Sequence, residues 1–280
     1  MDPSPADVEK LKQQARRIRR LVIEMLAAAG SGHPGGSLSA ADIVTCLYFA
    51  VMRHKPDDPF WEDRDRFILS KGHACPVLYA ALAEAGYIAH DLLSSLRRLG
   101  SPLQGHPDRR KLKLIEASTG SLGLGLSMGI GMALAARLRR SPSRTYVLLG
   151  DGECEEGQVW EAAMYGSHVK LGNLCAIVDY NRLQLDAAVA EITDLEPLAD
   201  KWRAFKWNTI EIDGHDYGQI LRAFGEADQA QDRPTVIVAS TVKGKGVSYM
   251  ENQLKFHGSV PDKPEDIQRA LAEIESGGSR

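Results

Sequence analysis

The sequence predicts an α/β protein built on a doubly wound, mostly parallel sheet with helices on both faces. Four apolar runs support this prediction: "TYVLLG", "LCAIVDY", "WNTIEID" and "PTVIVAST". These runs are continuous and rich in aliphatic or β-branched residues, without polar alternation, as is typical of strands that are covered on both faces. Segments with helical periodicity separate the runs, and strands that alternate with helices usually lie parallel to one another.

The first element expected along the chain is a long amphipathic helix. Apolar residues recur every three or four positions over residues 8–29, and Gly30 ends the helix. A Gly-rich loop follows, after which Ser39, with Asp42 three positions later, resembles a capping box and predicts the start of a second helix. The short apolar run over residues 67–69 predicts a strand that leads into the motif "SKGHA" and then into an Ala-rich helix.

The length and composition favour a single domain. At 280 residues, of which 44% are hydrophobic, the chain can bury a sizeable core. We expect one domain over residues 1–280, with the core at about 8–258 and a C-terminal helix and tail over 259–280. The polar ends, "MDPSPAD" and "ESGGSR", are expected to be frayed.

The charge and the cysteines exclude several classes of protein. A net charge of −3 argues against nucleic acid or an anionic membrane as a partner, and the basic clusters at residues 16–20 and 137–140 are interpreted as solvated helix faces. The cysteines have no CxxC spacing, which favours a reducing compartment over a disulfide framework. No signal peptide opens the chain and no apolar run approaches about eighteen residues, so we expect a soluble, cytoplasmic protein.

Polar clusters follow two consecutive strands of the predicted sheet. Asp151, in "GDG", comes directly after "TYVLLG", and Asn181, in "DYN", comes directly after the next apolar run. In an open parallel sheet, ligands collect at the carboxyl ends of the strands. Mg²⁺ prefers hard oxygen ligands and usually takes only one or two carboxylates, with phosphate oxygens and water. The pair, with a backbone carbonyl just after the Asn, therefore predicts a site for Mg²⁺, or for Ca²⁺ or Mn²⁺ in its place, and a diphosphate.

The glycines beside the aspartate fit this hypothesis. Gly150 and Gly152 would let a diphosphate approach the backbone more closely than a side chain would allow. Taken alone, "GDG" is more often a simple turn that ends a strand. Its combination with an asparagine after the next strand is much rarer and favours the ligand site.

Four of the eight histidines adjoin glycine: His33, His73, His106 and His257. A single histidine of this kind is more often a loop or capping residue than a catalytic one. Four on Gly-hinged loops indicate a cleft wall of neutral imidazoles that can donate, accept or transfer protons near pH 7. A zinc site is the rival interpretation, but the four are scattered, without an HxxxH pair or a nearby Cys.

These motifs resemble those of a known family. The stretch from "GDG" to the asparagine is similar to the diphosphate and metal motif of thiamine-diphosphate enzymes, and the whole chain resembles the N-terminal half of transketolases. The matching segments, in family order, are "SGHPGGSLSAADI", "LSKGHA", "LQGHPD", "STGSLGLGLSMGIGMALA", "GDGECEEGQVWEAA", "DYN", "EIDGHD" and "STVKGKG" with "FHG". They cover nearly the entire chain, so the resemblance is specific.

The resemblance implies roles for the candidate residues. His33 and His257 would contact the acceptor aldehyde or its alkoxide, His106 would hold the terminal hydroxyl of the donor, and His73 would lie beside the diphosphate, with Lys243 as a cationic contact. The implied contacts of thiamine diphosphate are His73, Gly120, Leu122, Gly150, Asp151, Gly152, Glu156, Asn181, Leu185, Lys243 and His257. The implied metal ligands are Asp151, Asn181 and the backbone carbonyl of Leu183.

Two of these segments also have simpler interpretations. The segment "GSLGLGLSMGIGMALA" could be only a closely packed, Gly-rich buried helix, and here we expect both packing and cofactor contact. Glu153, Glu155 and Glu156 would ordinarily form a solvated helix N-terminus that the helix dipole favours. By the resemblance, Glu156 instead links two active sites across a dimer interface.

The resemblance also implies a missing part. Family transketolases are more than twice this length, and a second domain supplies the glutamate that activates the cofactor. Nothing after residue 258 resembles that domain. The chain therefore looks like the diphosphate-binding subunit of a split transketolase, whose pyrimidine-binding subunit is a separate polypeptide. Two copies of each chain are expected to form a heterotetramer that transfers a two-carbon ketol group from a ketose, such as a ketose phosphate, to an aldose.

Two alternatives remain open. The chain could belong to another thiamine-diphosphate enzyme, such as a 2-oxo acid dehydrogenase component or a deoxyxylulose-phosphate synthase. The segments "LQGHPD" and "FHG" argue against this, because those family positions handle the hydroxylated substrate of transketolases. The chain could also be a non-catalytic regulatory subunit, which the intact Asp151, Asn181 and histidine set disfavours.

Overall fold

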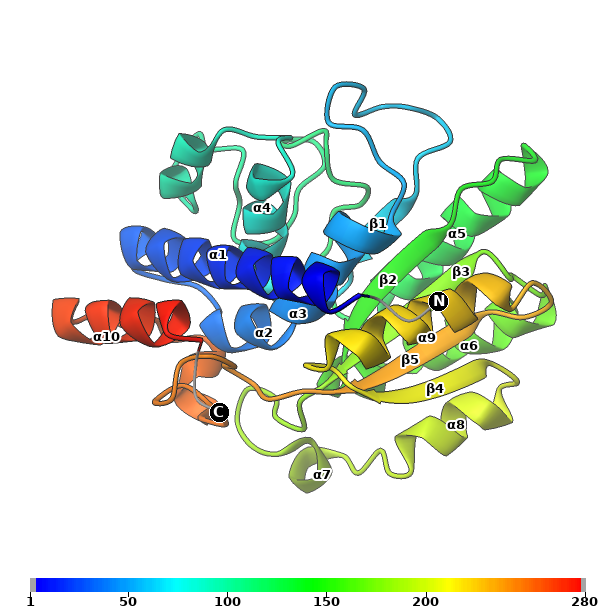
Figure 1. The fold of residues 1–280 in the computed structure, drawn as a ribbon. Helices are drawn as coiled ribbons and strands as arrows, with labels where there is room; N and C mark the ends of the chain where they lie inside the picture. Colours follow the sequence, from blue (N-terminus) through cyan, green and yellow to red (C-terminus); the bar gives the residue numbers. More distant parts are fainter. Residues whose placement is uncertain (1–3, 278–280) are drawn as a thin grey trace.

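The computed structural model describes residues 4–277, which contain one five-stranded sheet with all neighbouring strands parallel, as predicted (Figure 1). The strand order is β1-β2-β3-β5-β4. The strands are β1 (Arg66–Leu69), β2 (Thr145–Gly150), β3 (Leu174–Tyr180), β4 (Asn208–Asp213) and β5 (Thr235–Ser240). Gly150 pairs with Asp179, so the carboxyl ends of β2 and β3 lie at the same edge of the sheet.

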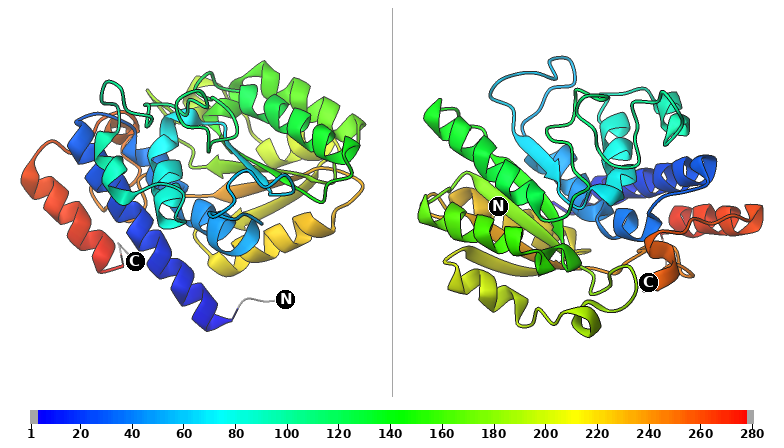
Figure 2. Two further views of the ribbon diagram at one scale, coloured as in Figure 1. Left: turned by 90° about the horizontal axis from the view of Figure 1, so that it is seen from above. Right: turned by 180° about the vertical axis from the view of Figure 1, so that it is seen from behind.

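Helices cover both faces of the sheet, which confirms the predicted fold class (Figures 1 and 2). One face carries α1 (Pro5–Ala29), α2 (Pro34–Ser39), α3 (Ala41–Cys46), α4 (Cys75–Glu84) and α9 (Tyr217–Gln229), with α10 (Pro264–Glu275) packed on α1. The opposite face carries α5 (Leu124–Leu138), α6 (Gly157–His168) and α8 (Leu198–Ala204), and α7 (Val189–Ile192) precedes α8. Shorter helical turns cover Leu47–Val51, Gly72–Ala74, His90–Ser95, Gly152–Glu155 and Leu254–His257.

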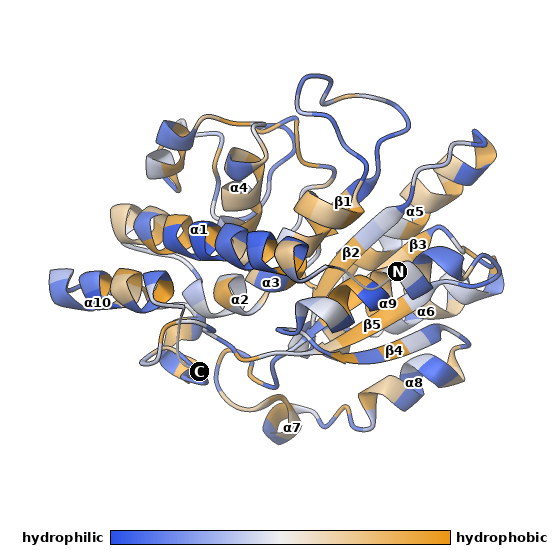
Figure 3. Ribbon diagram, in the orientation of Figure 1, coloured by the Kyte–Doolittle hydropathy of each residue, from blue (hydrophilic) through white to orange (hydrophobic). Residues whose placement is uncertain are grey.

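The sheet separates two hydrophobic cores because successive side chains of a strand point to opposite faces. In β2, Tyr146 and Leu148 pack with α1, α3, α4 and α9, whereas Val147 and Leu149 pack with α5, α6 and α8. Figure 3 shows the hydrophobic residues concentrated in the central strands. The continuous apolar runs of the central strands therefore follow from burial on both faces.

The first helix ends where the sequence predicts and begins earlier. Gly30 adopts φ 64°, a left-handed conformation that costs glycine little, and its amide donates to the last turn. At the other end, the Ser4 side chain accepts a hydrogen bond from the Asp7 amide at 3.2 Å. Residues 5–7 are helical, so the expectation of frayed ends is wrong there; residues 1–3 and 278–280 lie outside the described residues.

The predicted capping box at Ser39 and Asp42 is wrong. The helix α2 already begins at Pro34, within the segment predicted to be a loop, and Ser39 is its last residue. Both polar side chains are buried and bond to distant residues instead. The Ser39 hydroxyl donates to the Asp179 carboxylate at 2.5 Å, and Asp42 accepts two hydrogen bonds from Arg19. Tertiary polar partners therefore replace the local cap.

Exposure differs from the prediction at two further places. Arg19, which belongs to a basic cluster predicted to be solvated, is 7% exposed because its guanidinium pairs with a buried carboxylate. The segment "WNTIEID" forms β4, and α8 and α9 cover its two faces only incompletely. Within the described chain β4 pairs only with β5, and Glu211 and Asp213 are exposed at this sheet edge.

Over residues 4–277, none of the helices combines the length and the apolar character needed to cross a membrane. The longest helix, α1, has 25 residues but repeatedly carries charged ones. All of the cysteines are buried with free thiols: Cys46, Cys75, Cys154 and Cys175.

Candidate active site

The loops after the strands bring most of the candidate residues together at the carboxyl edge of the sheet. Lys71 and His73 follow β1, Asp151 follows β2, Asn181 follows β3 and Lys243 follows β5. A cavity of about 190 Å³ lies between these loops. It is lined by Gly36, Lys71, His73, Leu122, Gly150, Asp151, Gly152, Glu153, Asn181, Leu183, Gln184, Leu185, Lys243 and His257. The parallel topology thus brings the loops after four strands to one site, which α2, Leu122 and the turn at His257 complete.

Asp151 and Asn181 lie side by side because their strands are paired. Their exposed fractions are 2% and 7%. The Asp151 carboxylate accepts hydrogen bonds from the backbone amides of Gly152, at 2.9 Å, and of Arg182. Burial, and then the nearby Asp179 carboxylate, raise the pKa of Asp151 to about 7. This carboxyl is therefore poised to exchange its proton for a cation.

The backbone carbonyl of Leu183 contacts a positively charged group of the protein, the ammonium of Lys243. The Lys243 ammonium donates to this oxygen at 2.6 Å and also lies 2.8 Å from Nδ1 of His257. Burial, and then the charge of Lys71, lower the pKa of Lys243 to about 8. The carboxylate of Asp151, the amide oxygen of Asn181 and the Leu183 carbonyl form a set of hard oxygens, the donor chemistry that suits Mg²⁺.

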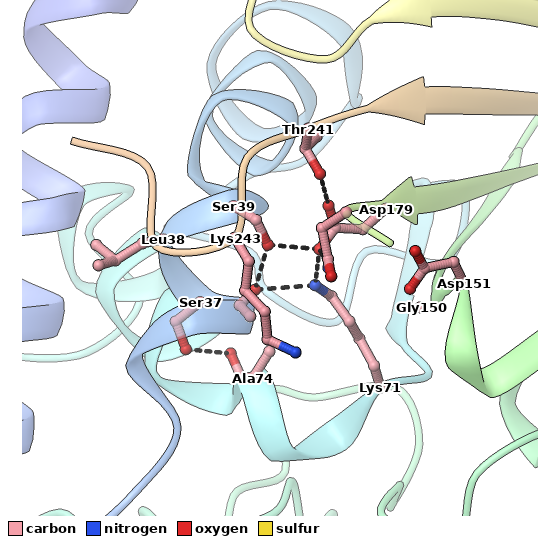
Figure 4. A network of polar contacts seen from close by, with 12 residues as sticks. Ser37, Leu38, Ser39, Lys71, Ala74, Gly150, Asp151, Asp179, Thr241 and Lys243 are labelled. Carbon is pink, nitrogen blue, oxygen red and sulfur yellow. Dashed lines mark hydrogen bonds and ion pairs between the residues drawn. The ribbon is translucent and has the colours of Figure 1, made fainter. Parts of the chain in front are cut away.

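A buried ion pair supports this edge and was missed in the sequence (Figure 4). The Lys71 ammonium contacts the Asp179 carboxylate and donates to the Gly36 carbonyl at 2.8 Å. Ser39 and Thr241 also donate hydroxyl hydrogen bonds to the same carboxylate. Although burial opposes ionisation, the Lys71 charge and these hydrogen bonds lower the pKa of Asp179. Both residues lie inside the motifs "SKGHA" and "DYN", but the sequence does not pair them.

The candidate histidines form one cluster, although they come from four separate loops. The ring of His33 lies 5.2 Å from that of His73, 5.6 Å from that of His257 and 6.3 Å from that of His106, centre to centre. The rings of His73 and His257 are stacked at 5.1 Å. The clustering agrees with the prediction, and of the four histidines His73 and His257 line the cavity. Among residues 4–277, no three His, Cys, Asp or Glu side chains are grouped as metal ligands.

The surroundings keep these imidazoles neutral. Burial, followed by the charge of Arg97, lowers the pKa of His33 to about 4, and burial with the charge of Lys243 lowers that of His257 to about 3. Burial also lowers the pKa values of His73 and His106. The buried Nδ1 of His33 has no hydrogen-bond partner among residues 4–277. A ligand could supply this missing partner.

Glu153 does not belong to a solvated acidic run, contrary to expectation. It is 3% exposed, and its carboxylate accepts hydrogen bonds from the backbone amides of Gly123, at 2.9 Å, and Gly150, at 3.0 Å. The Ser70 hydroxyl donates to it as well. Burial raises the pKa of this carboxyl. Glu153 thus ties the loops after β1 and β2 to the start of α5.

Two of the residues expected at the cofactor lie outside the cavity lining. Gly120 faces another candidate: a Cβ added to it would lie 3.1 Å from the His106 ring. Glu156 is exposed at the N-cap of α6, beside Gly123. Leu122 does line the cavity. The cofactor contacts predicted at these two residues, and those predicted at the residues that line the cavity, stay predictions.

Arg97 is a further charged group beside the histidines that the sequence did not indicate. Its charge lowers the pKa values of His33 and His106, after the effect of burial. Its guanidinium packs closely over Gly105, where a Cβ would lie 2.8 Å from Nε. Arg97 also has a positive φ of 60°, which is unusual for a residue with a side chain. Arg97 is followed by Arg98 in an exposed loop, and no motif in this part of the sequence indicates a binding or catalytic role.

Comparison with known proteins places this site in a family. A family profile described as "Transketolase, thiamine diphosphate binding domain" matches residues 10–274. The chain belongs to the transketolase family. The predicted resemblance is therefore confirmed, and thiamine diphosphate is the cofactor associated with this domain.

Two transketolase subunits match the chain over nearly their whole length. The 6-deoxy-6-sulfo-D-fructose transketolase subunit of a Clostridium species is 45% identical and covers 96% of this chain, which in turn covers 98% of that subunit. An apulose-4-phosphate transketolase subunit of Phocaeicola vulgatus is 43% identical, with 95% and 94% coverage. Human transketolase is 42% identical over 98% of this chain, but the match spans only 44% of the human protein.

Solved transketolase structures share the fold. A Pichia stipitis transketolase in complex with sedoheptulose 7-phosphate superposes with a TM-score of 0.90 and 34% identity, over 95% of this chain and 40% of that one. The transketolase of Leishmania mexicana gives a TM-score of 0.89 at 34% identity. The chain therefore has the architecture of one part of these longer transketolases.

Proposed function

We propose that the chain is the thiamine diphosphate-binding subunit of a two-chain transketolase, which transfers a two-carbon ketol group from a ketose to an aldose. The observation that carries the proposal is the cavity where the oxygens of Asp151, Asn181 and Leu183 lie near four clustered, neutral histidines. Length supports the subunit role: the match spans 98% of one transketolase subunit but 44% of human transketolase.

The cavity residues suit a magnesium diphosphate. Asp151, Asn181 and the Leu183 carbonyl would hold Mg²⁺, and Lys243 would balance the diphosphate charge. A Cβ added at Gly150 would fit without a clash, in ordinary van der Waals contact with Lys71 Cδ at 3.7 Å, so the backbone here is not crowded by its neighbours. When bound, thiamine diphosphate supplies the nucleophilic carbon that ketol transfer requires and that no side chain can provide.

The histidines would move protons at sugar oxygens. Breaking and forming a carbon–carbon bond next to a hydroxyl needs a group that takes a proton and returns it, and a neutral imidazole does both. His33 and His257 would serve the acceptor aldehyde and its alkoxide, and His106 would hold the terminal hydroxyl of the donor. His73, which lines the cavity, would lie beside the diphosphate.

We propose that the substrates are sugars with an anionic group. Arg97 places a positive charge beside His33 and His106, at the part of the site that would receive the sugar. Two relatives are named for sugars with such groups, apulose 4-phosphate and 6-deoxy-6-sulfo-D-fructose. A guanidinium binds phosphate and sulfonate oxygens through paired N–H donors.

The partner subunit would bind on α5 and α6, in a heterotetramer with two copies of each chain. These two helices pack against each other and expose large apolar side chains. The exposed fractions are 40% for Leu124, 37% for Met128, 57% for Met164 and 50% for Tyr165. Neighbouring exposed apolar residues of this kind are typical of subunit contacts. Glu156, at the start of α6, would lie at the same interface.

Replacing His106 with alanine tests the substrate role. We expect kcat/KM of the assembled enzyme to fall by roughly ten- to ten-thousand-fold, the range from a lost hydrogen bond to a lost proton-transfer group. The affinity for Mg²⁺–thiamine diphosphate should stay near the wild-type value, because His106 does not line the cavity. Steady-state kinetics and calorimetry separate the two effects. His90→Ala, at an exposed position away from α5 and α6, is the matched control; equal kinetics in both variants would remove the substrate role of His106.

The pKa values of Asp151 and Lys243 predict an optimum for cofactor binding. With a pKa of about 7, the Asp151 carboxyl is protonated below neutral pH, so Mg²⁺ must displace a proton and the affinity falls as the pH drops. With a pKa of about 8, Lys243 loses its charge at higher pH, which weakens the diphosphate contact. Affinity for Mg²⁺–thiamine diphosphate should therefore be highest between these two values.

Calorimetry across this pH range measures the effect. Lys243→Met should abolish the decrease in affinity at alkaline pH, because that decrease comes from the lysine. It should keep the decrease at acid pH, which comes from Asp151. An affinity that is constant from about one pH unit below the Asp151 pKa to one unit above the Lys243 pKa would contradict both assignments.

A further inference from the structure

A second buried polar cluster lies outside the cavity and includes the motif "DGHD", which the proposed reaction leaves unexplained. Its members are Arg19 of α1, Asp42 of α3, and His215 and Tyr217 after β4. The guanidinium donates to both carboxylate oxygens of Asp42, at 2.8 and 2.7 Å, and the Tyr217 hydroxyl donates to the same carboxylate. Arg19, Asp42 and Tyr217 are 7%, 4% and 6% exposed, and the four side chains border a separate cavity of about 260 Å³. Their polar atoms therefore satisfy one another with little access to water.

The hydrogen bonds of His215 define its protonation. Its Nε2 accepts the backbone N–H of Val242 at 2.9 Å, so Nε2 does not carry a proton. Its Nδ1 lies 2.7 Å from the Asp42 carboxylate and is therefore the nitrogen that donates. Although burial opposes ionisation, Arg19 and His215 lower the pKa of Asp42. The ionised carboxylate thus holds the imidazole in the tautomer that can accept from the loop.

The cluster holds the loop segment 242–245 at both ends. At its start, the imidazole accepts the Val242 amide; at its end, the guanidinium Nε donates to the Lys245 carbonyl at 3.1 Å. Lys243 lies between these two points, and its ammonium reaches into the cofactor cavity. A single buried cluster therefore sets the backbone position of the residue that carries this charge.

Two glycines permit the close approach between cluster and loop. A Cβ on Gly214, just before the histidine, would lie 2.5 Å from Thr241 Cγ2. Gly246 adopts φ +96°, and a Cβ there would lie 3.2 Å from Cδ of Arg19. Larger residues at either position would push the loop away from the cluster. Gly214 and His215 of "DGHD" therefore have one explanation, the close packing of this segment against residues 241 and 242.

We propose that Arg19, Asp42 and His215 form a clamp that positions Lys243 for the cofactor diphosphate. These are positioning residues, since none of them lines the cavity. The inference rests on the proposed function, because the diphosphate contact of Lys243 is itself part of that proposal. A loop held at both ends loses little conformational entropy when the ligand binds, which increases affinity.

His215→Ala in the full chain tests the clamp. We expect the affinity for Mg²⁺–thiamine diphosphate, measured by calorimetry, to fall by about three- to tenfold, the effect of one lost hydrogen bond. Without ligand, the Val242 amide should exchange its hydrogen faster, because its acceptor is gone. His215→Gln offers an oxygen acceptor and an N–H donor, and it should restore most of the affinity.

Tyr217→Phe is the matched control. It removes the hydroxyl that donates to Asp42 and leaves the hydrogen bond between His215 and Val242 in place. Its affinity should equal that of the wild type even if its melting temperature falls. The clamp is refuted by unchanged affinity in His215→Ala, or by an equal loss in Tyr217→Phe. No binding of the cofactor by the wild-type chain assembled with its partner subunit would instead refute the proposed function.

Discussion

Replacing Asp151 with alanine is expected to lower the affinity for Mg²⁺–thiamine diphosphate by at least about a hundredfold, since loss of even an outer contact of a metal site costs ten- to a hundredfold. The carboxylate is the only charged member of the proposed ligand set, which otherwise contains an amide oxygen and a backbone carbonyl. The fold should survive, because the residue lies on the loop after β2 and outside both hydrophobic cores. Calorimetry with the full chain measures the affinity.

Asn181→Asp is the informative companion to this variant. It keeps an oxygen ligand but adds a negative charge beside Asp179, whose carboxylate accepts a hydrogen bond from the asparagine at 3.1 Å. Its affinity should fall less than that of Asp151→Ala. Circular dichroism establishes that each variant is folded. Undiminished cofactor binding by a folded Asp151→Ala chain would disprove the metal assignment.

The 280-residue chain alone is expected to transfer ketol groups at less than about a thousandth of the rate of the assembled enzyme, the size of effect expected when a proton-transfer group is absent. Activation of the cofactor requires a protein carboxylate that forms a hydrogen bond with the aminopyrimidine ring of the cofactor. In the part of the chain that the structure describes, the carboxylates that line the cavity are Asp151 and Glu153. Asp151 is assigned to the metal. Glu153 already accepts hydrogen bonds from Ser70, Gly123 and Gly150.

Mixing the chain with its partner subunit should restore the activity. A coupled assay with a phosphorylated ketose and aldose measures the rate, and light scattering gives the mass of the complex, expected to be two copies of each chain. The Asp151→Ala chain, mixed with the same partner, should assemble but stay inactive. Ketol transfer by the purified chain at the rate of the mixture would overturn the two-subunit proposal.

The parallel sheet and its ligand edge could be predicted from local patterns. Continuous apolar runs identify strands buried on both faces, and the end of each run gives the position of the loop that follows. Because parallel strands end at one edge, Asp151 and Asn181 could be assigned to a common site without any knowledge of side-chain contacts. The four histidines were grouped by a different signal, the glycine beside each of them, and Lys243 was assigned only through the family resemblance.

The edge strand β4 marks the limit of that argument. Residues 209–213 alternate: Ile210 and Ile212 pack on the core, whereas Glu211 and Asp213 are exposed. The sequence therefore already carried the pattern of a half-covered edge strand, which the prediction of a continuous apolar run overlooked. Arg97 is a different case. Its loop has no periodic pattern, and the positive charge reaches the histidines only through the folded path of the chain.

The sequence alone determined which residues end the strands and therefore which chemical groups meet at the site. Only the tertiary structure decided the partners of buried polar groups. Ser39 and Asp42 have the spacing of a helix cap, but they bond to Asp179 and Arg19, which are distant in sequence. Glu153 likewise leaves a predicted solvated run to accept three hydrogen bonds. Local spacing describes a few neighbouring residues, whereas a buried polar atom takes whichever donor or acceptor the packing of distant segments brings within reach.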